Sequence, residues 1–246
     1  MAIGDKGWFR RVFMVIAPRL LLGGVLTGAL SMSVLASDMA EYHKHELEKA
    51  MQLKPDIEHG KQVFKTCSLC HSDDGWGMVQ GIGRMKPNGY YPQLAGQHPN
   101  VVIKQLSDIR EGNRDNPTMY PFTLDKYVGG PQGVADVTAY IATLKRNPDN
   151  EKGFGRDLAY GERLYKDNCV ECHGEYGEGS NEKFHPRIQG QNYTYLLRQM
   201  QWIRDGKRRN ANEKMVRQIH NFTHRDIQAV IDYVSRLPDP PKDIVF

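Results

Sequence analysis

The chain has 246 residues, of which 39% are hydrophobic and 25% are charged. This composition is typical of a globular protein, and it argues against a disordered chain, a collagen-like repeat and a multi-span membrane protein. The net charge is +4, but four basic residues and one acidic residue lie in the first 36 positions. The remainder carries 29 basic and 28 acidic side chains. A body so close to neutral does not support nucleic-acid binding, which requires a clear basic excess.

The first 36 residues have the pattern of an export signal. Basic residues precede a mostly apolar stretch from Val12 to Ala36, and small residues near Ala36 suit a signal peptidase. An uncleaved membrane anchor is the alternative, because the apolar run from Leu20 to Ala36 has 17 residues, and a spanning helix needs about 17–25. Both interpretations carry the rest of the chain across the membrane.

Several short segments occur twice in the same order, which indicates two copies of one unit. CSLCH at 67–71 recurs as CVECH at 169–173, and YPQLAGQ at 91–97 recurs as HPRIQGQ at 185–191. The first copy carries about eight extra residues near 81–90. The predicted organisation is the signal peptide or anchor at 1–36, an N-terminal extension at 37–54, a first domain at 55–146, a linker at 147–154 and a second domain at 155–246.

Each copy is expected to be helical. Apolar residues spaced by three and four positions form one stripe at 102–109, repeated at 196–203, and another at 134–144, repeated at 227–237. No alternation typical of strands stands out, so the sequence predicts an all-α fold. Further expectations are short helices around 57–65 and 157–166 and a capping box formed by Thr223 and Asp226. Tyr140 and Tyr233 also match, and we expect core positions for them, with packing near the haem as the alternative.

Both copies contain Cys-x-x-Cys-His, the attachment signature of c-type haem. Residues at i, i+3 and i+4 share one face of a helix, so two thiols can bond one porphyrin while the histidine meets its iron. A zinc site, two structural disulfides and a thioredoxin-like redox pair are the alternatives. The motif predicts one haem on Cys67, Cys70 and His71, and a second on Cys169, Cys172 and His173.

Methionine is the usual second axial ligand of an electron-transfer haem, and it raises the reduction potential. Met119 and Met215 occupy matching positions in the two copies and are the predicted ligands, so that the metal-binding residues would be His71, Met119, His173 and Met215. Met78 and Met85 are the other candidates in the first copy, with Met85 as the reserve. We expect Met200 to be a core residue, and His98, His185 and His220 to lie at the surface or in loops.

Two further matches concern the surroundings of the haems. Pro92 and Pro186 correspond in the two copies. A carbonyl there could orient each axial imidazole by accepting its other N–H, and a plain turn role is the alternative. Basic residues around Met215 suggest a docking face for an acidic partner, with a solvated helix face as the alternative: Arg198, Arg204, Lys207, Arg208, Arg209, Lys214 and Arg217.

At these residues the chain resembles the dihaem class I cytochromes c, specifically those of the cytochrome c-four type. The resemblance rests on the two Cys-x-x-Cys-His motifs, on the LAGQ and IQGQ segments ending at Gln97 and Gln191, and on Met119 and Met215. It implies two tandem cytochrome c folds related by pseudo-twofold symmetry, with one covalent haem c in each. It also implies a periplasmic protein that shuttles single electrons from a donor, such as a cytochrome complex or a periplasmic dehydrogenase, to a terminal oxidase or similar acceptor.

Under this hypothesis the protein is an electron carrier and not an enzyme. One alternative is a dihaem oxidoreductase of the peroxidase or thiosulfate dehydrogenase type, which requires an open iron position or an unusual Cys ligand. All four cysteines are already used by the two motifs. The other alternative is a membrane-tethered subunit of a larger respiratory complex, held through the N-terminal segment.

Overall fold

The computed structural model describes residues 48–77 and 90–241. The predicted export signal or anchor at 1–36 lies outside the described residues, as do most of the extension and of the inserted loop, with Met78 and Met85. Both copies of the repeat belong to one compact unit, Ala40–Phe246. No helix among the described residues combines the length and the apolar character that crossing a bilayer requires.

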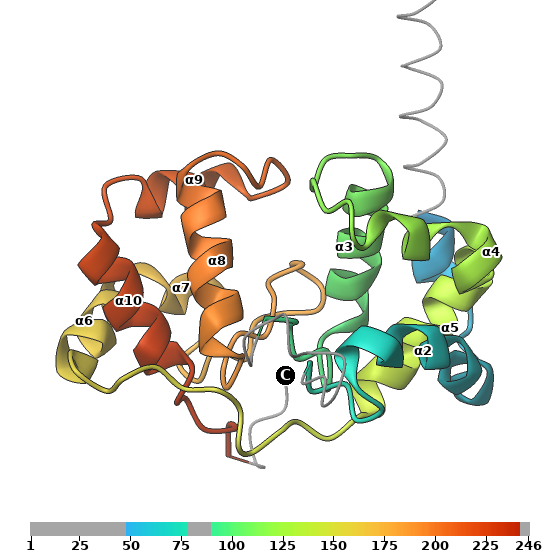
Figure 1. The fold of residues 1–246 in the computed structure, drawn as a ribbon, viewed down its shortest axis with the longest axis horizontal. Coiled ribbons are helices and arrows are strands. Elements are labelled where there is room, and N and C mark those ends of the chain that lie inside the picture. Colours follow the sequence, from blue (N-terminus) through green and yellow to red (C-terminus); the bar gives the residue numbers. More distant parts are fainter. Residues whose placement is uncertain (1–47, 78–89, 242–246) are drawn as a thin grey trace, which may run out of the picture. The chain divides into compact units, whose positions relative to one another are not determined.

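The described part of the chain is helical and contains no strand, only an isolated antiparallel bridge between Ser180 and His185. The all-α prediction is therefore confirmed, and the helices of the two repeats can be followed in Figure 1. The first repeat contains α2 (Ile57–His71), α3 (Pro99–Arg110), the 3-10 turn η2 (Tyr120–Thr123), α4 (Asp125–Val128) and α5 (Gly130–Thr143). The second contains α6 (Leu158–Asn168), α7 (Val170–His173), α8 (Tyr193–Arg204), α9 (Glu213–Ile219) and α10 (His224–Val234).

Each repeat is built on a close helix crossing, α2 with α5 in the first and α6 with α10 in the second. Glycine makes both crossings possible. A Cβ added at Gly60 would lie 2.1 Å from the carbonyl oxygen of Asp136, and one added at Gly161 would lie 2.1 Å from that of Ala229. Because any side chain would push the helices apart, these glycines fix where the cysteine motifs sit above the core.

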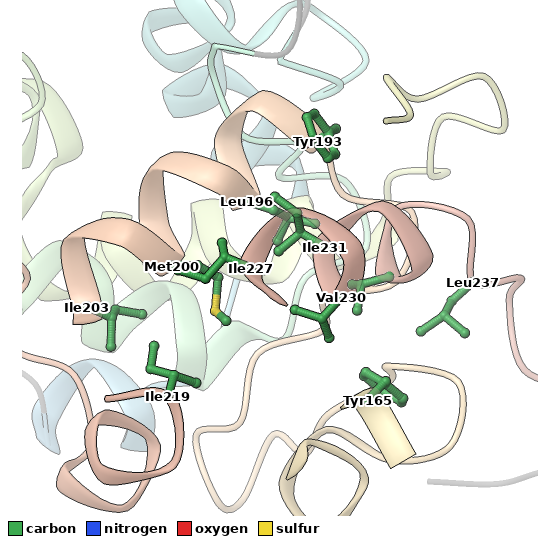
Figure 2. Packing of buried hydrophobic residues seen from close by; sticks show 11 residues of the cluster. Tyr165, Tyr193, Leu196, Met200, Ile203, Ile219, Ile227, Val230, Ile231 and Leu237 are labelled. Carbon is green, nitrogen blue, oxygen red and sulfur yellow. The ribbon is translucent and has the colours of Figure 1, made fainter. Parts of the chain in front are cut away.

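The core of the second repeat is one apolar cluster, shown in Figure 2, to which α8 and α10 contribute their predicted stripes. Met200 is 9% exposed and belongs to this cluster, as expected. Tyr233 packs its ring against Tyr165, with centroids 5.7 Å apart. Tyr140 packs in the same way against Phe64, at 5.4 Å. Both tyrosines are therefore partly buried and pack against the apolar clusters.

The polar segment predicted to be a linker is packed against the second repeat. Asn147 and Asn150 are only 6% and 7% exposed. The Asn150 amide donates to the carbonyl oxygens of Ser235, at 2.9 Å, and of Gln191, at 3.3 Å. Buried main-chain carbonyls need donors, and the asparagine supplies them. The polar composition of this segment therefore reflects a hydrogen-bonded junction between the repeats.

Candidate haem-binding sites

The two cysteine motifs lie at the ends of helices. In the first repeat Cys67 and Cys70 lie on the last turns of α2, which runs on to His71 and so is longer than predicted. In the second repeat the helix breaks at Cys169, where φ is −121°, and the short α7 carries the rest of the motif. His71 is 4% exposed and the matching His173 is 8% exposed. Each motif therefore delivers a buried imidazole beside two thiols.

Both histidines are oriented by a proline carbonyl, which is the first of the two roles considered for the matching prolines. The Nδ1 atom of His71 lies 3.0 Å from the carbonyl oxygen of Pro92, and that of His173 lies 3.0 Å from the carbonyl oxygen of Pro186. A carbonyl can only accept a hydrogen bond, so Nδ1 carries the proton in each ring and Nε2 keeps its lone pair. The two imidazoles are therefore set up to bind a metal through Nε2.

Electrostatics keeps these rings neutral. Burial lowers the pKa of His71 to about 4, and the hydrogen bond to the Pro92 carbonyl opposes this shift only in part. Burial likewise lowers the pKa of His173 to about 4. A neutral imidazole is the form that coordinates metals. At neutral pH both rings are thus in the state that an iron site requires.

Glycines allow the carbonyls to approach. Gly77 has a φ of +75°, and its N–H donates to the carbonyl oxygen of His71 at 2.9 Å. A Cβ added there would lie 2.6 Å from the carbonyl oxygen of Pro92. At the equivalent Gly179, where φ is +70°, it would lie 2.7 Å from the carbonyl oxygen of Pro186. Glycine is therefore required at both positions to hold the imidazole and its carbonyl together.

The cysteines border apolar interiors. Cys67 packs against the cluster of Phe64, Val102 and their neighbours, and Cys169 packs against the core of the second repeat. Burial raises the pKa of Cys67 to about 11 and that of Cys169 to about 12. The four cysteines are not joined in disulfides. Two thiols and a neutral imidazole beside an apolar core fit a flat, hydrophobic, covalently attached prosthetic group that binds iron.

The predicted axial methionines lie in comparable segments. Met119 is half-buried directly before η2, and its N–H donates to the carbonyl oxygen of Asn116 at 3.0 Å. Met215 lies on α9 and packs against the core of the second repeat. Their roles as ligands stay predictions.

The three other histidines differ in their surroundings. His98 is half-buried, and its Nε2 lies 2.7 Å from the carbonyl oxygen of Glu178 in the other repeat. His185 lies beside His173, with ring centroids 6.4 Å apart. His220 is exposed at the end of α9. His98 thus contributes to the contact between the repeats, a role that its position in the sequence does not reveal.

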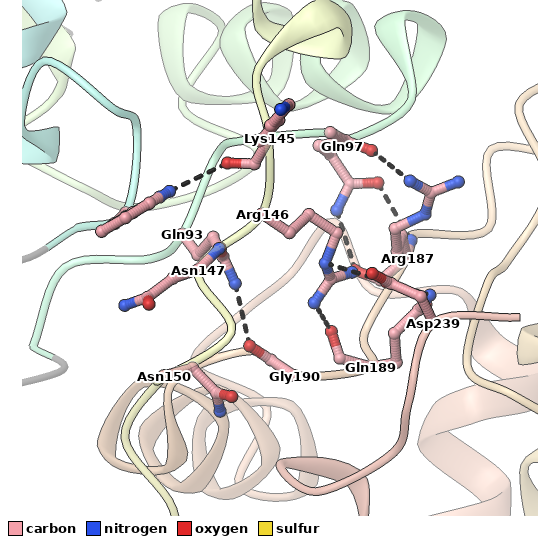
Figure 3. A network of polar contacts seen from close by, with 12 residues as sticks. Gln93, Gln97, Lys145, Arg146, Asn147, Asn150, Arg187, Gln189, Gly190 and Asp239 are labelled. Atoms are coloured by element: carbon pink, nitrogen blue, oxygen red, sulfur yellow. Dashed lines mark hydrogen bonds and ion pairs between the residues drawn. The ribbon is translucent and has the colours of Figure 1, made fainter.

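A polar network joins the repeats, and Figure 3 shows its side chains. The Gln93 amide donates to the carbonyl oxygen of Gly190 at 2.8 Å, and Gln97 donates to that of Arg187, also at 2.8 Å. Arg187 in turn donates to the carbonyl oxygen of Gly96 at 2.8 Å. The sequence shows the repeated LAGQ and IQGQ segments but does not show their role. Their signal was the recurrence of a polar glutamine after an apolar segment.

Some of the basic residues near Met215 bind the other repeat. Arg208 donates to Gln105 of the first repeat at 2.8 Å, Arg209 donates to the carbonyl oxygen of Gly112, and Arg198 donates to that of Tyr90 at 2.7 Å. All three arginines bind the other repeat. Arg198 and Arg208 are half-buried there, whereas Arg209 stays exposed. Lys214 and Arg217 are exposed, and each forms an ion pair with a glutamate. Arg198 and Arg208 therefore belong to the junction between the repeats, and the proposed docking face would rest on the remaining exposed cations.

Comparison with known proteins agrees with this geometry. The family model "Cytochrome c" matches the chain twice, at residues 57–145 and 158–238. The chain is 28% identical to a cytochrome c4 from Azotobacter vinelandii, over 74% of this chain and 89% of that protein. It is 29% identical to a thiosulfate dehydrogenase electron acceptor from Stutzerimonas stutzeri, over 70% of this chain and 78% of that protein.

Solved structures show the same similarity. Reduced recombinant cytochrome c4 from Pseudomonas stutzeri superposes with a TM-score of 0.64 at 25% identity, covering 75% of this chain and all of that one. A thiosulfate dehydrogenase from Marichromatium purpuratum superposes with a TM-score of 0.60 at 25% identity, over 74% of this chain and 40% of that one. With two covalent haem c groups, one in each repeat, the chain belongs to the cytochrome c family and within it to the dihaem cytochromes of the c4 type.

Proposed function

We propose that this dihaem electron-transfer cytochrome is a periplasmic carrier of single electrons. The observation that carries the proposal is the matched pair of histidines, each with Nδ1 3.0 Å from a proline carbonyl oxygen and Nε2 left for iron. A redox site with both axial positions filled transfers electrons without binding substrate. The first haem is attached through Cys67 and Cys70 with His71 and Met119 as ligands, and the second through Cys169 and Cys172 with His173 and Met215.

Haem c supplies a one-electron couple between ferrous and ferric iron. The chain's own residues set the conditions for that couple. The carbonyls of Pro92 and Pro186 hold each imidazole in one tautomer and one orientation. The apolar clusters exclude water and lower the local dielectric, which disfavours the extra positive charge of the ferric state. Neutral thioether ligands from Met119 and Met215 act in the same direction.

The partners are other redox proteins. The relative named as a thiosulfate dehydrogenase electron acceptor supports a role in receiving electrons from a dehydrogenase. Donors of this kind, or a cytochrome complex, would reduce the protein, and a terminal oxidase or a similar acceptor would oxidise it. The N-terminal segment exports the chain to the periplasm. There the protein is free after cleavage near Ala36, or tethered to the inner membrane through residues 12–36.

The competing function is catalysis, and the structural match to a thiosulfate dehydrogenase favours it. The two functions differ in whether an iron position is open. We expect the reduced protein to bind carbon monoxide slowly or not at all, and to turn over neither thiosulfate nor peroxide without a partner enzyme. Rapid carbon monoxide binding together with turnover would instead identify a dihaem oxidoreductase.

A further inference from the structure

Three arginines from the two repeats meet at the junction. Arg114, from the first repeat, donates to the Tyr195 hydroxyl at 3.1 Å and to the Gln199 side-chain oxygen at 3.2 Å. Arg208, from the second repeat, donates to the same Gln199 oxygen at 2.9 Å. One neutral acceptor is thus shared by two cations. We refer to these residues as the junction arginine cluster: Arg114, Arg208 and the neighbouring Arg198.

The junction arginine cluster lacks compensating negative charge. Within residues 48–77 and 90–241, none of its three members forms an ion pair. Asp108 is an anion near Arg208, but its carboxylate already binds Lys104 at 2.5 Å and the Asn210 amide at 2.7 Å. Buried cations are normally paired. The positive charge of the cluster is therefore not neutralised by any carboxylate of the described residues, and an added anion would stabilise it.

The perturbed pKa values agree with this excess of positive charge. Burial, together with the charge of Arg114, lowers the pKa of Arg208 to about 10. Burial raises the pKa of Tyr195, but the charges of Arg114, Arg208 and Arg198 outweigh that effect and leave it below its usual value. An added anion would relieve the repulsion that acts among the arginines.

Arg198 has hydrogen-bond donors with no acceptor. Its guanidinium lies over the ring of Tyr90, 4.1 Å from the centroid, and one nitrogen donates to the Tyr90 carbonyl oxygen. Its Nε and Nη1 atoms are buried and make no hydrogen bond to any described residue. Stacking covers the faces of a guanidinium, whereas its N–H groups point outward in the plane. The Nε–H group and the Nη1–H groups lie on different edges of that plane, so each can donate to a separate carboxylate oxygen.

The cluster borders the haem sites. Arg114 precedes Met119 by five residues and Arg208 precedes Met215 by seven. Tyr91, which follows the Tyr90 bound by Arg198, has its ring centroid 6.1 Å from that of His71. The acceptors missing from the cluster would therefore lie where the first prosthetic group sits.

We propose that the junction arginine cluster binds propionate carboxylates of the haems, so that Arg198 of the second repeat holds and tunes the haem of the first. This inference rests on the haem assignment under the proposed function. Lys104, at the matching position of the first repeat, pairs with Asp108 of its own helix and does not reciprocate. An arginine from the opposite repeat would therefore affect the reduction potential of the first haem but not that of the second. A cation near the iron disfavours the ferric state, so Arg198 raises the potential of the first haem.

The test compares Arg198→Gln with Arg225→Gln, in the full matured protein. Arg225 is an exposed arginine of α10 that pairs with Asp157, so its replacement removes the same charge away from the cluster. We expect both variants to keep two covalent haems by haem absorbance. In Arg198→Gln, one midpoint potential should fall, with about a tenfold weaker affinity for the electron, equivalent to about 59 mV for one electron. Arg225→Gln should leave both potentials unchanged.

Arg198→Lys keeps the charge and should retain most of the potential, which separates electrostatic tuning from a packing defect. Arg114→Gln tests the cluster from the first repeat if Arg198→Gln does not fold, and it should lower a potential in the same direction. Full haem content with potentials equal to those of Arg225→Gln would overturn the inference and leave the proposed function standing. A wild-type protein without two haems would contradict the proposed function itself.

Discussion

The side chain of Gln191 satisfies both main-chain groups of Gln93. Its Oε1 accepts from the Gln93 N–H at 2.7 Å, and its Nε2 donates to the Gln93 carbonyl oxygen at 2.8 Å. The two residues are 98 positions apart and belong to different repeats. Gln191 is 7% exposed and Gln93 is 4% exposed, so water does not replace these bonds. The pair therefore couples the two haem domains at a buried point.

Replacing Gln191 by leucine should weaken this coupling. The substitution leaves the N–H and the carbonyl of Gln93 buried without partners, and each such group costs about 1–3 kcal/mol. We expect the free energy of unfolding to fall by about 2–6 kcal/mol in total, with the two repeats unfolding in separate steps. Urea denaturation followed by circular dichroism measures both effects. Gln52→Leu, at an exposed position, is the control, and an equal loss there would refute the role of the pair.

The approach of the Pro92 carbonyl to His71 should depend on Gly77. In Gly77→Ala the new Cβ overlaps the Pro92 carbonyl, so we expect a stability loss of roughly 1–3 kcal/mol and an altered imidazole orientation. Gly112 has the same φ of +75°, but an added Cβ meets nothing within 4 Å. Gly112→Ala therefore carries only the backbone strain, about 1 kcal/mol.

Electron paramagnetic resonance of the oxidised protein separates these two effects, because it reports the axial ligand geometry of ferric haem. The signal of one haem should change in Gly77→Ala and remain unchanged in Gly112→Ala. Identical spectra in the two variants would show that the carbonyl contact does not orient the ring.

The axial methionines can be tested against a core methionine of the same repeat. Met215→Leu should lower the potential of the second haem, because the thioether favours ferrous iron. The expected fall is on the order of 100 mV, within the roughly 0.8 V range that axial ligands span. The open position should also bind carbon monoxide in the reduced protein. Met200→Leu, within the apolar core, should neither lower the potential nor allow carbon monoxide to bind.

Met119→Leu should affect the first haem in the same way. If instead Met119→Leu binds no carbon monoxide and keeps its potential, Met119 is not the ligand. The ligand of the first haem would then be sought among Met78 and Met85.

The buried carboxylate of Asp136 should make the stability of the protein depend on pH in the acidic range. Its carboxylate is 1% exposed and accepts from the Asp56 N–H at 2.7 Å and from the Gln132 amide at 2.7 Å, with His59 Nδ1 at 2.6 Å. Burial raises its pKa, but these bonds outweigh burial and leave the pKa below the ordinary value of 3.8. The stabilisation is therefore complete above that value and is lost as pH falls through the lowered pKa.

In Asp136→Asn we expect a loss of about 1–3 kcal/mol at neutral pH. The difference from wild type should shrink as the pH drops below about 4. Thermal unfolding measured across this pH range provides the check, with the exposed Asp149→Asn as the control. A difference that stays constant down to pH 2 would contradict the assignment.

The sequence predicts those helices, caps and contacts that depend on the spacing of residues close together in the chain. The stripes that became α8 and α10 follow the helical period, and the capping box of Thr223 and Asp226 forms as expected. The contacts of Pro92 and Pro186 with the histidines could be predicted because the prolines recur at matched positions. These features need only neighbours in the chain or the internal repeat.

Contacts between the repeats could not be predicted in this way. The bonds of Gln191 and of Arg198 depend on how two folded domains dock, and no period in the sequence reports it. The arginines near Met215 illustrate the problem, because a run of basic residues has the same sequence pattern whether it faces solvent or a junction. The break at Cys169, where the first repeat continues its helix, likewise depends on local backbone geometry that the shared motif does not encode.

The central claim is that each repeat holds one iron between an imidazole and a thioether and exchanges one electron. A potentiometric titration of the matured protein, followed in the visible and near infrared, tests it most directly. We predict two one-electron transitions, each of which removes a methionine-to-ferric charge-transfer band on reduction. A single transition, or oxidised haems without that band, would contradict the account.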